Sequence, residues 1–146
     1  MSGIRHAAIV TADVDTSMRF WCDGLGFTEL FDYTFTGDWP TLFGAATDRL
    51  RSIFLGDPAN PDTGIVELVV LEGTTDAGQS PERPAFGFFL LSLQRDVEPT
   101  LATLAGLGFD DGIRRIEMPA PGGKRVAMAV ITAPDGVRVE LIGQPV

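Results

Sequence analysis

The residues best suited to chemistry are one histidine and two glutamates that lie in apolar segments. His6 is the only histidine of the 146 residues, Glu67 lies in "GIVELVVL", and Glu140 lies in "GVRVELIG". An imidazole or a carboxylate can transfer a proton or bind a metal ion. A lone histidine near the start of a strand is, however, more often an ordinary surface or hydrogen-bonded residue. Residue type alone therefore assigns no role to His6.

The neighbours of Glu67 predict where its side chain points. Side chains alternate between the two faces of a strand, so Glu67 shares a face with Ile65 and Val69. The residues between them are also apolar, so both faces of this strand are expected to be covered. Burying an unpaired carboxylate is costly. We therefore expect Glu67 to point into an enclosed concavity rather than into bulk water.

Glu140 allows two interpretations from the sequence. It shares a face with Arg138, whereas Val137, Val139 and Leu141 lie on the other face. One interpretation is an ion pair between Arg138 and Glu140, which contributes little to stability if it is exposed. The other is a metal ligand or a catalytic base. The spacing does not separate them.

Composition limits the class of protein and its partners. The chain is 45% hydrophobic and carries a net charge of −9, so it can form a core but would repel phosphate backbones. Nucleic acid is not an expected partner. Cys22 is the only cysteine, which excludes an intrachain disulfide and suits a cytoplasmic location. We also expect no signal peptide and no membrane span.

A repeat in the sequence shows which elements must position these side chains. "DVDTSMRFWCDGLGF" at residues 13–27 is matched by "DVEPTLATLAGLGF" at residues 96–109, and Val-Glu-Leu closes both halves. Each copy predicts a strand, a helix ended by glycine, and three more strands. We expect a first βαβββ module at residues 1–72, a linker at 73–84 and a second βαβββ module at 85–146, forming one structural domain overall.

The first strand and helix of each half are predicted from local patterns. Strands are expected at residues 4–11 and 85–93, and helices at 16–24 and 99–108. Asp15 is the expected N-cap of the first helix. Its expected core residues lie at helical spacing and are Met18, Trp21, Cys22 and Leu25.

The duplicated unit, with "H…DVD…FW…GLGF" at the front and "APDGVRVEL" at the back, resembles the vicinal-oxygen-chelate superfamily. This superfamily includes glyoxalase I, bleomycin-resistance proteins, extradiol dioxygenases and methylmalonyl-CoA epimerase. The resemblance covers nearly the whole chain. It implies an α+β fold in which two tandem βαβββ modules form a cup-shaped mixed sheet. It does not by itself imply one activity.

The resemblance also implies a set of metal-ligand positions. Members that bind a metal take four ligands from the first and last strands of each half, which here gives His6, Glu67 and Glu140 as metal ligands. The fourth position falls at Phe89 or a neighbour, by matching the seven-residue spacing from His6 to Asp13, and a phenyl ring cannot bind a metal. The three remaining side chains suit a divalent ion of zinc, nickel, manganese, cobalt or iron.

The resemblance implies, as the preferred function, a metal-dependent lyase or isomerase of the glyoxalase or epimerase type. Its small-molecule substrate would have neighbouring oxygens and react through an enediolate, with Glu67 or Glu140 as the catalytic residue that moves the proton. A metal-free enzyme with one of these glutamates as base is an intermediate alternative.

The resemblance also leaves two other functions within the same superfamily open. The main alternative is a non-catalytic drug- or antibiotic-binding protein of the bleomycin-resistance type, favoured by the many aromatic residues, the acidic charge and the apolar fourth position. An extradiol dioxygenase is disfavoured, because such enzymes hold iron with two histidines and this chain has one. The resemblance implies a homodimer, within which the modules could pair in one chain or be exchanged between chains.

Overall fold

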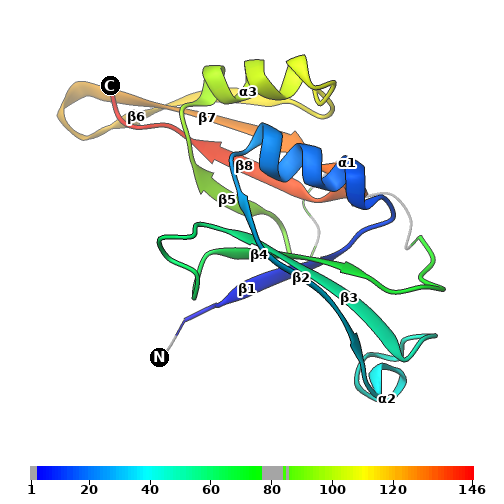
Figure 1. Cartoon of the computed structure of the whole chain (residues 1–146). Coiled ribbons are helices and arrows are strands. Elements are labelled where there is room, and N and C mark those ends of the chain that lie inside the picture. The colour runs from blue at the N-terminus through cyan, green and yellow to red at the C-terminus, as the bar shows by residue number, and fades with distance from the viewer. Residues whose placement is uncertain (1–2, 77–83, 85) are drawn as a thin grey trace. The chain divides into compact units, whose positions relative to one another are not determined.

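The computed structural model describes residues 3–76, 84 and 86–146, and its contacts divide the chain into two units, Met1–Gly78 and Gln79–Val146. Each unit contains a sheet of its own (Figure 1). The division falls inside the segment predicted as a linker, residues 73–84. That the two modules form one structural domain stays a prediction.

The first unit follows the predicted order of one helical segment and four strands, with a short additional helix. Its elements are β1 (His6–Val10), α1 (Val14–Met18), η1 (Arg19–Gly24), β2 (Thr28–Thr36), α2 (Trp39–Phe43), β3 (Arg49–Gly56) and β4 (Ile65–Val70).

The helical segment after β1 differs from the prediction at its start and in its winding. Asp13, not Asp15, is the N-cap, because its carboxylate accepts a hydrogen bond from the Thr16 amide at 3.0 Å. From Arg19 onward the segment winds as a π-helix, in which the Leu25 amide donates to the Phe20 carbonyl.

The π-helical winding also changes which side chains of this segment enter the core. The wider turn places the adjacent Phe20 and Trp21 both in the core, and Leu25 is buried as expected. The expectation that Met18 and Cys22 are core residues was wrong, since both are only half-buried.

The second unit repeats the first in a shorter form. Its elements are β5 (Leu91–Gln94), α3 (Val97–Gly106), β6 (Arg114–Ala120), η2 (Pro121–Gly123), β7 (Lys124–Thr132), η3 (Pro134–Gly136) and β8 (Arg138–Ile142).

The strand predicted at residues 85–93 proved much shorter than expected. Residues 86–90 are not in a strand, and Phe86 and Phe88 are fully or largely exposed. Aromatic residues favour strands, but a strand also needs a hydrogen-bonding neighbour, and pairing with β8 begins only at Leu91. Residue 85 lies outside the described residues.

The two sheets have the same topology within the described residues. Their orders are β1-β4-β3-β2 and β5-β8-β7-β6, and in each the first strand pairs in parallel with the last while the other pairings are antiparallel. The predicted α+β fold class is confirmed. Val-Glu-Leu therefore lies in a central strand of both sheets, which explains why this motif is repeated.

Each sheet has one buried face and one face that carries the glutamate. In the first unit Ile53 and Leu68 are paired and buried, and α1 contacts β4. In the second unit Ile131 and Val139 are paired and buried, and α3 contacts β7. Glu67 directly precedes Leu68, and Glu140 directly follows Val139. Because side chains alternate along a strand, both glutamates point to the face opposite these buried pairs.

No helix within the described part of the chain is long and apolar enough to cross a membrane.

Candidate functional site

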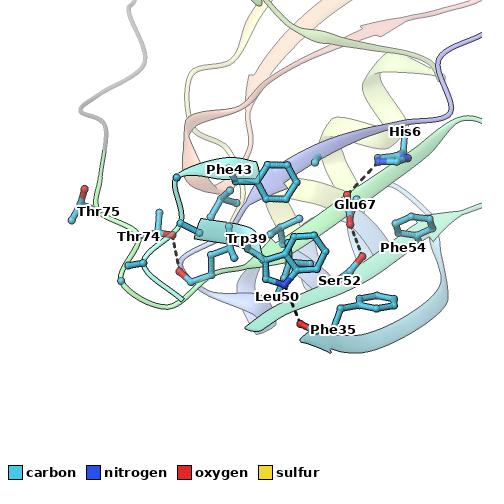
Figure 2. Close-up of a pocket in the computed structure, with 18 of the residues that line it drawn as sticks. His6, Phe35, Trp39, Phe43, Leu50, Ser52, Phe54, Glu67, Thr74 and Thr75 are labelled. Carbon is cyan, nitrogen blue, oxygen red and sulfur yellow. Dashed lines mark hydrogen bonds and ion pairs between the residues drawn. The ribbon is translucent and has the colours of Figure 1, made fainter. Parts of the chain in front are cut away.

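The first unit contains a cavity of about 940 Å³ on the sheet face that carries Glu67 (Figure 2). Register explains this placement, because Ala8, Phe54 and Glu67 are direct cross-strand neighbours and project to the same side. Segment 39–46, which includes α2, contributes the outer wall. The apolar and aromatic lining residues are Ala8, Val10, Phe31, Phe35, Trp39, Phe43, Ala45, Ala46, Leu50, Phe54, Val69 and Leu71.

A polar cluster interrupts this apolar lining. The His6 Nε2 atom lies 3.3 Å from Glu67 Oε1, and the Ser52 hydroxyl donates to Glu67 Oε2 at 2.5 Å. The Glu67 side chain is 14% exposed and Ser52 is buried, so the carboxylate is held from both sides (Figure 2). This agrees with the expectation that Glu67 points into a concavity.

The imidazole of His6 has a second nitrogen that lacks a hydrogen-bond partner among the described residues. His6 Nδ1 is buried and makes no hydrogen bond to any described residue. The ring is packed against Phe54, with ring centroids 5.2 Å apart. With Nδ1 unpaired, the orientation of the imidazole depends on this ring contact and on Glu67.

Glu140 has a different partner in the second unit. Its Oε1 accepts a hydrogen bond of 2.8 Å from the Ser92 hydroxyl, on the adjacent parallel strand β5. The guanidinium of Arg138 lies over the Phe89 ring, 5.2 Å from its centroid. The described geometry of Glu140 is thus a hydrogen bond to Ser92, which sequence reasoning did not anticipate.

The strand register identifies the counterpart of His6 in the second unit. Ala8 pairs with Glu67 and Ser92 pairs with Glu140, so the residue two before Ser92 matches the residue two before Ala8. That residue is Leu90, one position later than the Phe89 predicted from the seven-residue spacing. The spacing was misleading because the link between β5 and α3 is shorter than the link between β1 and α1. Either residue is apolar and cannot bind a metal.

Comparison with known proteins gives the family of this chain. A family model described as Glyoxalase/Bleomycin resistance protein/Dioxygenase superfamily matches residues 3–141. The chain belongs to this superfamily. It is also 32% identical over 149 residues to the lactoylglutathione lyase-like protein terB of Aspergillus terreus, an alignment that covers 97% of this chain and 75% of that protein.

Solved structures of the glyoxalase superfamily share the fold. A glyoxalase family protein from Bacillus cereus matches with a TM-score of 0.72 and 14% identity, covering 96% of this chain and 92% of that one. The trypanothione-dependent glyoxalase I of Leishmania major matches with a TM-score of 0.64 and 21% identity, covering 98% and 87%. At these identities the likeness concerns the fold.

Members of this glyoxalase superfamily commonly use a divalent metal, and the His6–Glu67 pair has a geometry suited to one. Two ligands bound to one zinc ion at tetrahedral angles, with bonds of about 2.0–2.2 Å, lie about 3.4 Å apart. The separation of His6 Nε2 from Glu67 Oε1 is 3.3 Å. This separation matches that of two neighbouring ligands, and it equally matches the direct contact that the two side chains form with each other.

The predicted set of three ligands is only partly brought together. His6 and Glu67 lie side by side in the first unit, whereas Glu140 belongs to the second. Across the residues that the structure describes, no group of three or more His, Cys, Asp or Glu side chains could hold a metal ion. The role of Glu140 as third ligand stays a prediction.

Sequence reasoning missed the two serines that orient the glutamates. Ser52 is the only polar residue in the run "SIFL" of β3, and it lies two residues from Phe54, the cross-strand neighbour of Glu67. A hydroxyl facing a carboxylate across a sheet could have been proposed once the pairing of β3 with β4 was known. The sequence alone does not give that register.

Proposed function

We propose that this chain is a metal-dependent lyase or isomerase of the glyoxalase superfamily that acts on a small substrate with neighbouring oxygens. The observation that carries this proposal is the His6–Glu67 pair, with a ligand-like separation of 3.3 Å, at the wall of a large apolar cavity. The similarity to a lactoylglutathione lyase-like protein supports the same class of reaction.

His6 and Glu67 would hold the ion in this proposal, with Glu140 as a third ligand. A divalent ion, when bound, would polarise a substrate carbonyl and lower the cost of negative charge on the neighbouring oxygens. What supports Glu140 is its position, since it occupies in β8 the place that Glu67 occupies in β4, on the face away from the helix.

Proton transfer is the task assigned to a glutamate of this set. A carboxylate removes the proton from the carbon next to the carbonyl, becomes a carboxylic acid, and returns the proton to the neighbouring carbon. Glu67 is suited to this role because its carboxylate faces the cavity and Ser52 fixes one of its oxygens. The aromatic walls would exclude bulk water and hold the substrate against the carboxylate.

A non-catalytic small-molecule binder is the second candidate, and one observation favours it. Five phenylalanine or tryptophan rings line the described cavity: Phe31, Phe35, Trp39, Phe43 and Phe54. Such a lining supplies binding energy without chemistry. Leu90, the apolar residue at the position equivalent to His6, also favours a binder, because it cannot bind a metal. The partly buried Ser52–Glu67–His6 cluster has no evident purpose in a simple binder, so we place the enzyme first.

Exchange of a substrate proton with solvent separates the two candidates. We would incubate the protein with Zn²⁺, Ni²⁺ or Mn²⁺ and a panel of α-hydroxyketones and hemithioacetals in deuterated water, and follow the C–H signal by NMR. The enzyme is expected to exchange or isomerise at least one compound, and Glu67→Gln should abolish this.

The exchange experiment also has informative negative outcomes. Exchange that persists in excess chelator and is lost in Glu67→Gln would indicate a metal-free enzyme. Binding of aromatic compounds by calorimetry, with no exchange of any compound under any metal, would contradict the proposed activity in favour of the binder. Glu117→Gln, a change of an exposed glutamate in the second unit, is the control.

A further inference from the structure

Arg5 is a cation that lines the cavity and has no acidic partner among the described residues. It forms no ion pair with them, whereas Arg51, Arg115 and Arg125 are paired with Asp32, Glu98 and Glu117. On a chain with a net charge of −9, acidic partners are plentiful. Arg5 is exposed, so water hydrates its guanidinium, and an anionic group that enters the cavity can replace that water.

The position of Arg5 is fixed by an aromatic ring rather than by a carboxylate. Its guanidinium lies over Phe54, 5.3 Å from the ring centroid, and the imidazole of His6 also packs against Phe54. Such cation–π packing orients the guanidinium but leaves its N–H donors unused. Arg5 therefore contacts the same ring as His6, and its guanidinium forms no ion pair with a described side chain.

The other charged groups of the cavity do not compete for Arg5. The titratable side chains among the described lining residues are Arg5, His6 and Glu67. The Glu67 carboxylate is already engaged by His6 Nε2 and by the Ser52 hydroxyl. An anionic group that enters this cavity would find Arg5 as a donor, because a guanidinium binds a carboxylate through paired hydrogen bonds.

The remaining walls of the cavity favour a flat apolar body. Trp39 and Phe43 of α2 are stacked, with an interplanar angle of 10° and centroids 5.6 Å apart, and the Phe43 side chain is largely exposed. Phe31 meets Phe54 edge to face. Aromatic rings arranged in this way offer both faces and edges to a planar ligand, which they would contact by stacking (Figure 2).

We propose that the cavity selects a small aromatic molecule that carries an anionic oxygen group, with that group on Arg5 and the ring among Phe31, Phe54, Trp39 and Phe43. This inference rests on the proposed function, since it names the ligand class of the same site. It adds a role for Arg5 that neither the metal-ligand set nor the proton transfer requires.

Calorimetry with a matched pair of probes tests the role of Arg5. The full chain, in excess chelator so that no metal can bind the probe, is titrated with 2-naphthoate and with 2-naphthamide, which share a ring and differ in charge. We expect naphthoate to bind about tenfold more tightly, as one charge-assisted pair would provide. Arg5→Gln should remove the difference, and Arg5→Lys should keep part of it.

The control variant is Arg49→Gln, which removes the same charge from the opposite face of the same sheet. Arg49 is one residue out of step with the cavity-lining Leu50, so it does not face the cavity. It should leave the preference for naphthoate intact. Equal affinity of the wild type for the two probes would overturn this inference. An equal loss of the preference for naphthoate in Arg5→Gln and Arg49→Gln would overturn it as well. Because the measurement is made without metal, either result leaves the metal and proton-exchange experiments to decide the proposed function separately.

Discussion

At the scale of single residues, the sequence predicted the direction of Glu67, and the family resemblance predicted that His6 lies near it, but neither predicted the hydrogen bond from Ser52. Apolar neighbours on both faces of its strand were enough to predict a concavity, because an unpaired buried carboxylate would be too costly. The partners, His6 Nε2 and the Ser52 hydroxyl, come from two other strands. Their proximity depends on strand register, which local sequence does not encode. The register also makes Leu90, a neighbour of the predicted Phe89, the counterpart of His6 in the second unit.

Ser52 is expected to position Glu67. Replacing it with alanine removes the donor to a carboxylate that is only 14% exposed, so Ser52→Ala should lower the free energy of unfolding by about 1–3 kcal/mol. It should also weaken zinc binding at least tenfold, as loss of a group that orients a metal ligand roughly does. Urea unfolding and calorimetry with zinc would measure the two effects.

Ser92→Ala is the matched control, because Ser92 donates to Glu140 in an exposed setting. Water can replace this donor, so we expect a loss of less than about 1 kcal/mol. Equal losses of stability in the two variants would contradict the account of Ser52.

The ion pair of Asp32 and Arg51 gives a pH dependence with a defined sign. The hydrogen bonds from the Arg51 guanidinium lower the pKa of Asp32 below its usual value of 3.8. The contribution of the pair is therefore complete at neutral pH and is lost as the pH falls through this lowered pKa. Asp32→Asn should destabilise the protein at pH 7 by no more than about 1 kcal/mol, since the pair is partly exposed.

Urea unfolding of the wild type and Asp32→Asn at several pH values would measure this dependence. The difference between them should narrow on acidification below the ordinary pKa of a carboxyl. A difference that widens on acidification would show that the sign is wrong.

At the scale of elements, periodicity and glycine predicted which elements exist, and tertiary contacts decided where they end. The π-helical turn from Arg19 to Gly24 was missed because the apolar spacing in this segment also fits an ordinary helix. The strand predicted at residues 85–93 is a strand only from Leu91 onward, because residues 86–90 pair with no strand in the described part of the chain. Helix α3 was predicted to begin at Pro99 but begins two residues earlier, at Val97. Proline is tolerated there because it still lies in the first turn.

Two glycines near the end of α3 are expected to respond in opposite directions to alanine. Gly106 is helical and an added Cβ would meet nothing within 4 Å, so Gly106→Ala should stabilise the protein by roughly 0.5 kcal/mol. Gly108 has a φ of +90°, which a side chain disfavours, so Gly108→Ala should destabilise it by at least about 1 kcal/mol.

Thermal unfolding of the two variants would measure both changes in stability, a gain for Gly106→Ala and a loss for Gly108→Ala. The result bears on the repeated Gly-Leu-Gly-Phe motif, whose second glycine also has a positive φ in the first half, at Gly26. A gain of stability in Gly108→Ala would contradict the role assigned to this glycine.

At the scale of the whole molecule, the duplication was the strongest information in the sequence. Two copies of Gly-Leu-Gly-Phe and Val-Glu-Leu in the same order predicted two βαβββ modules, and each sheet has the same strand order with its glutamate on the same face. The cavity was harder to predict. Its outer wall is the segment 39–46, which has no counterpart in the repeated motifs of the sequence.

The superfamily commonly forms dimers, and we propose that this chain does so too. Sedimentation equilibrium is expected to give a mass twice that of the 15.6 kDa chain at micromolar concentration. A single-chain mass over the whole concentration range would contradict a dimer. That result would also require any metal site to be completed within one chain.

The central claim is that His6 and Glu67 together hold a divalent metal ion, and metal content tests it most directly. The protein, purified without a histidine tag, is dialysed against limiting Zn²⁺, Ni²⁺, Mn²⁺, Co²⁺ or Fe²⁺ and analysed by mass spectrometry of the elements. We predict one ion per chain, lost in His6→Ala and in Glu67→Gln but retained in Glu117→Gln. Negligible metal in the wild type, or the same content in His6→Ala as in the wild type, would contradict the claim.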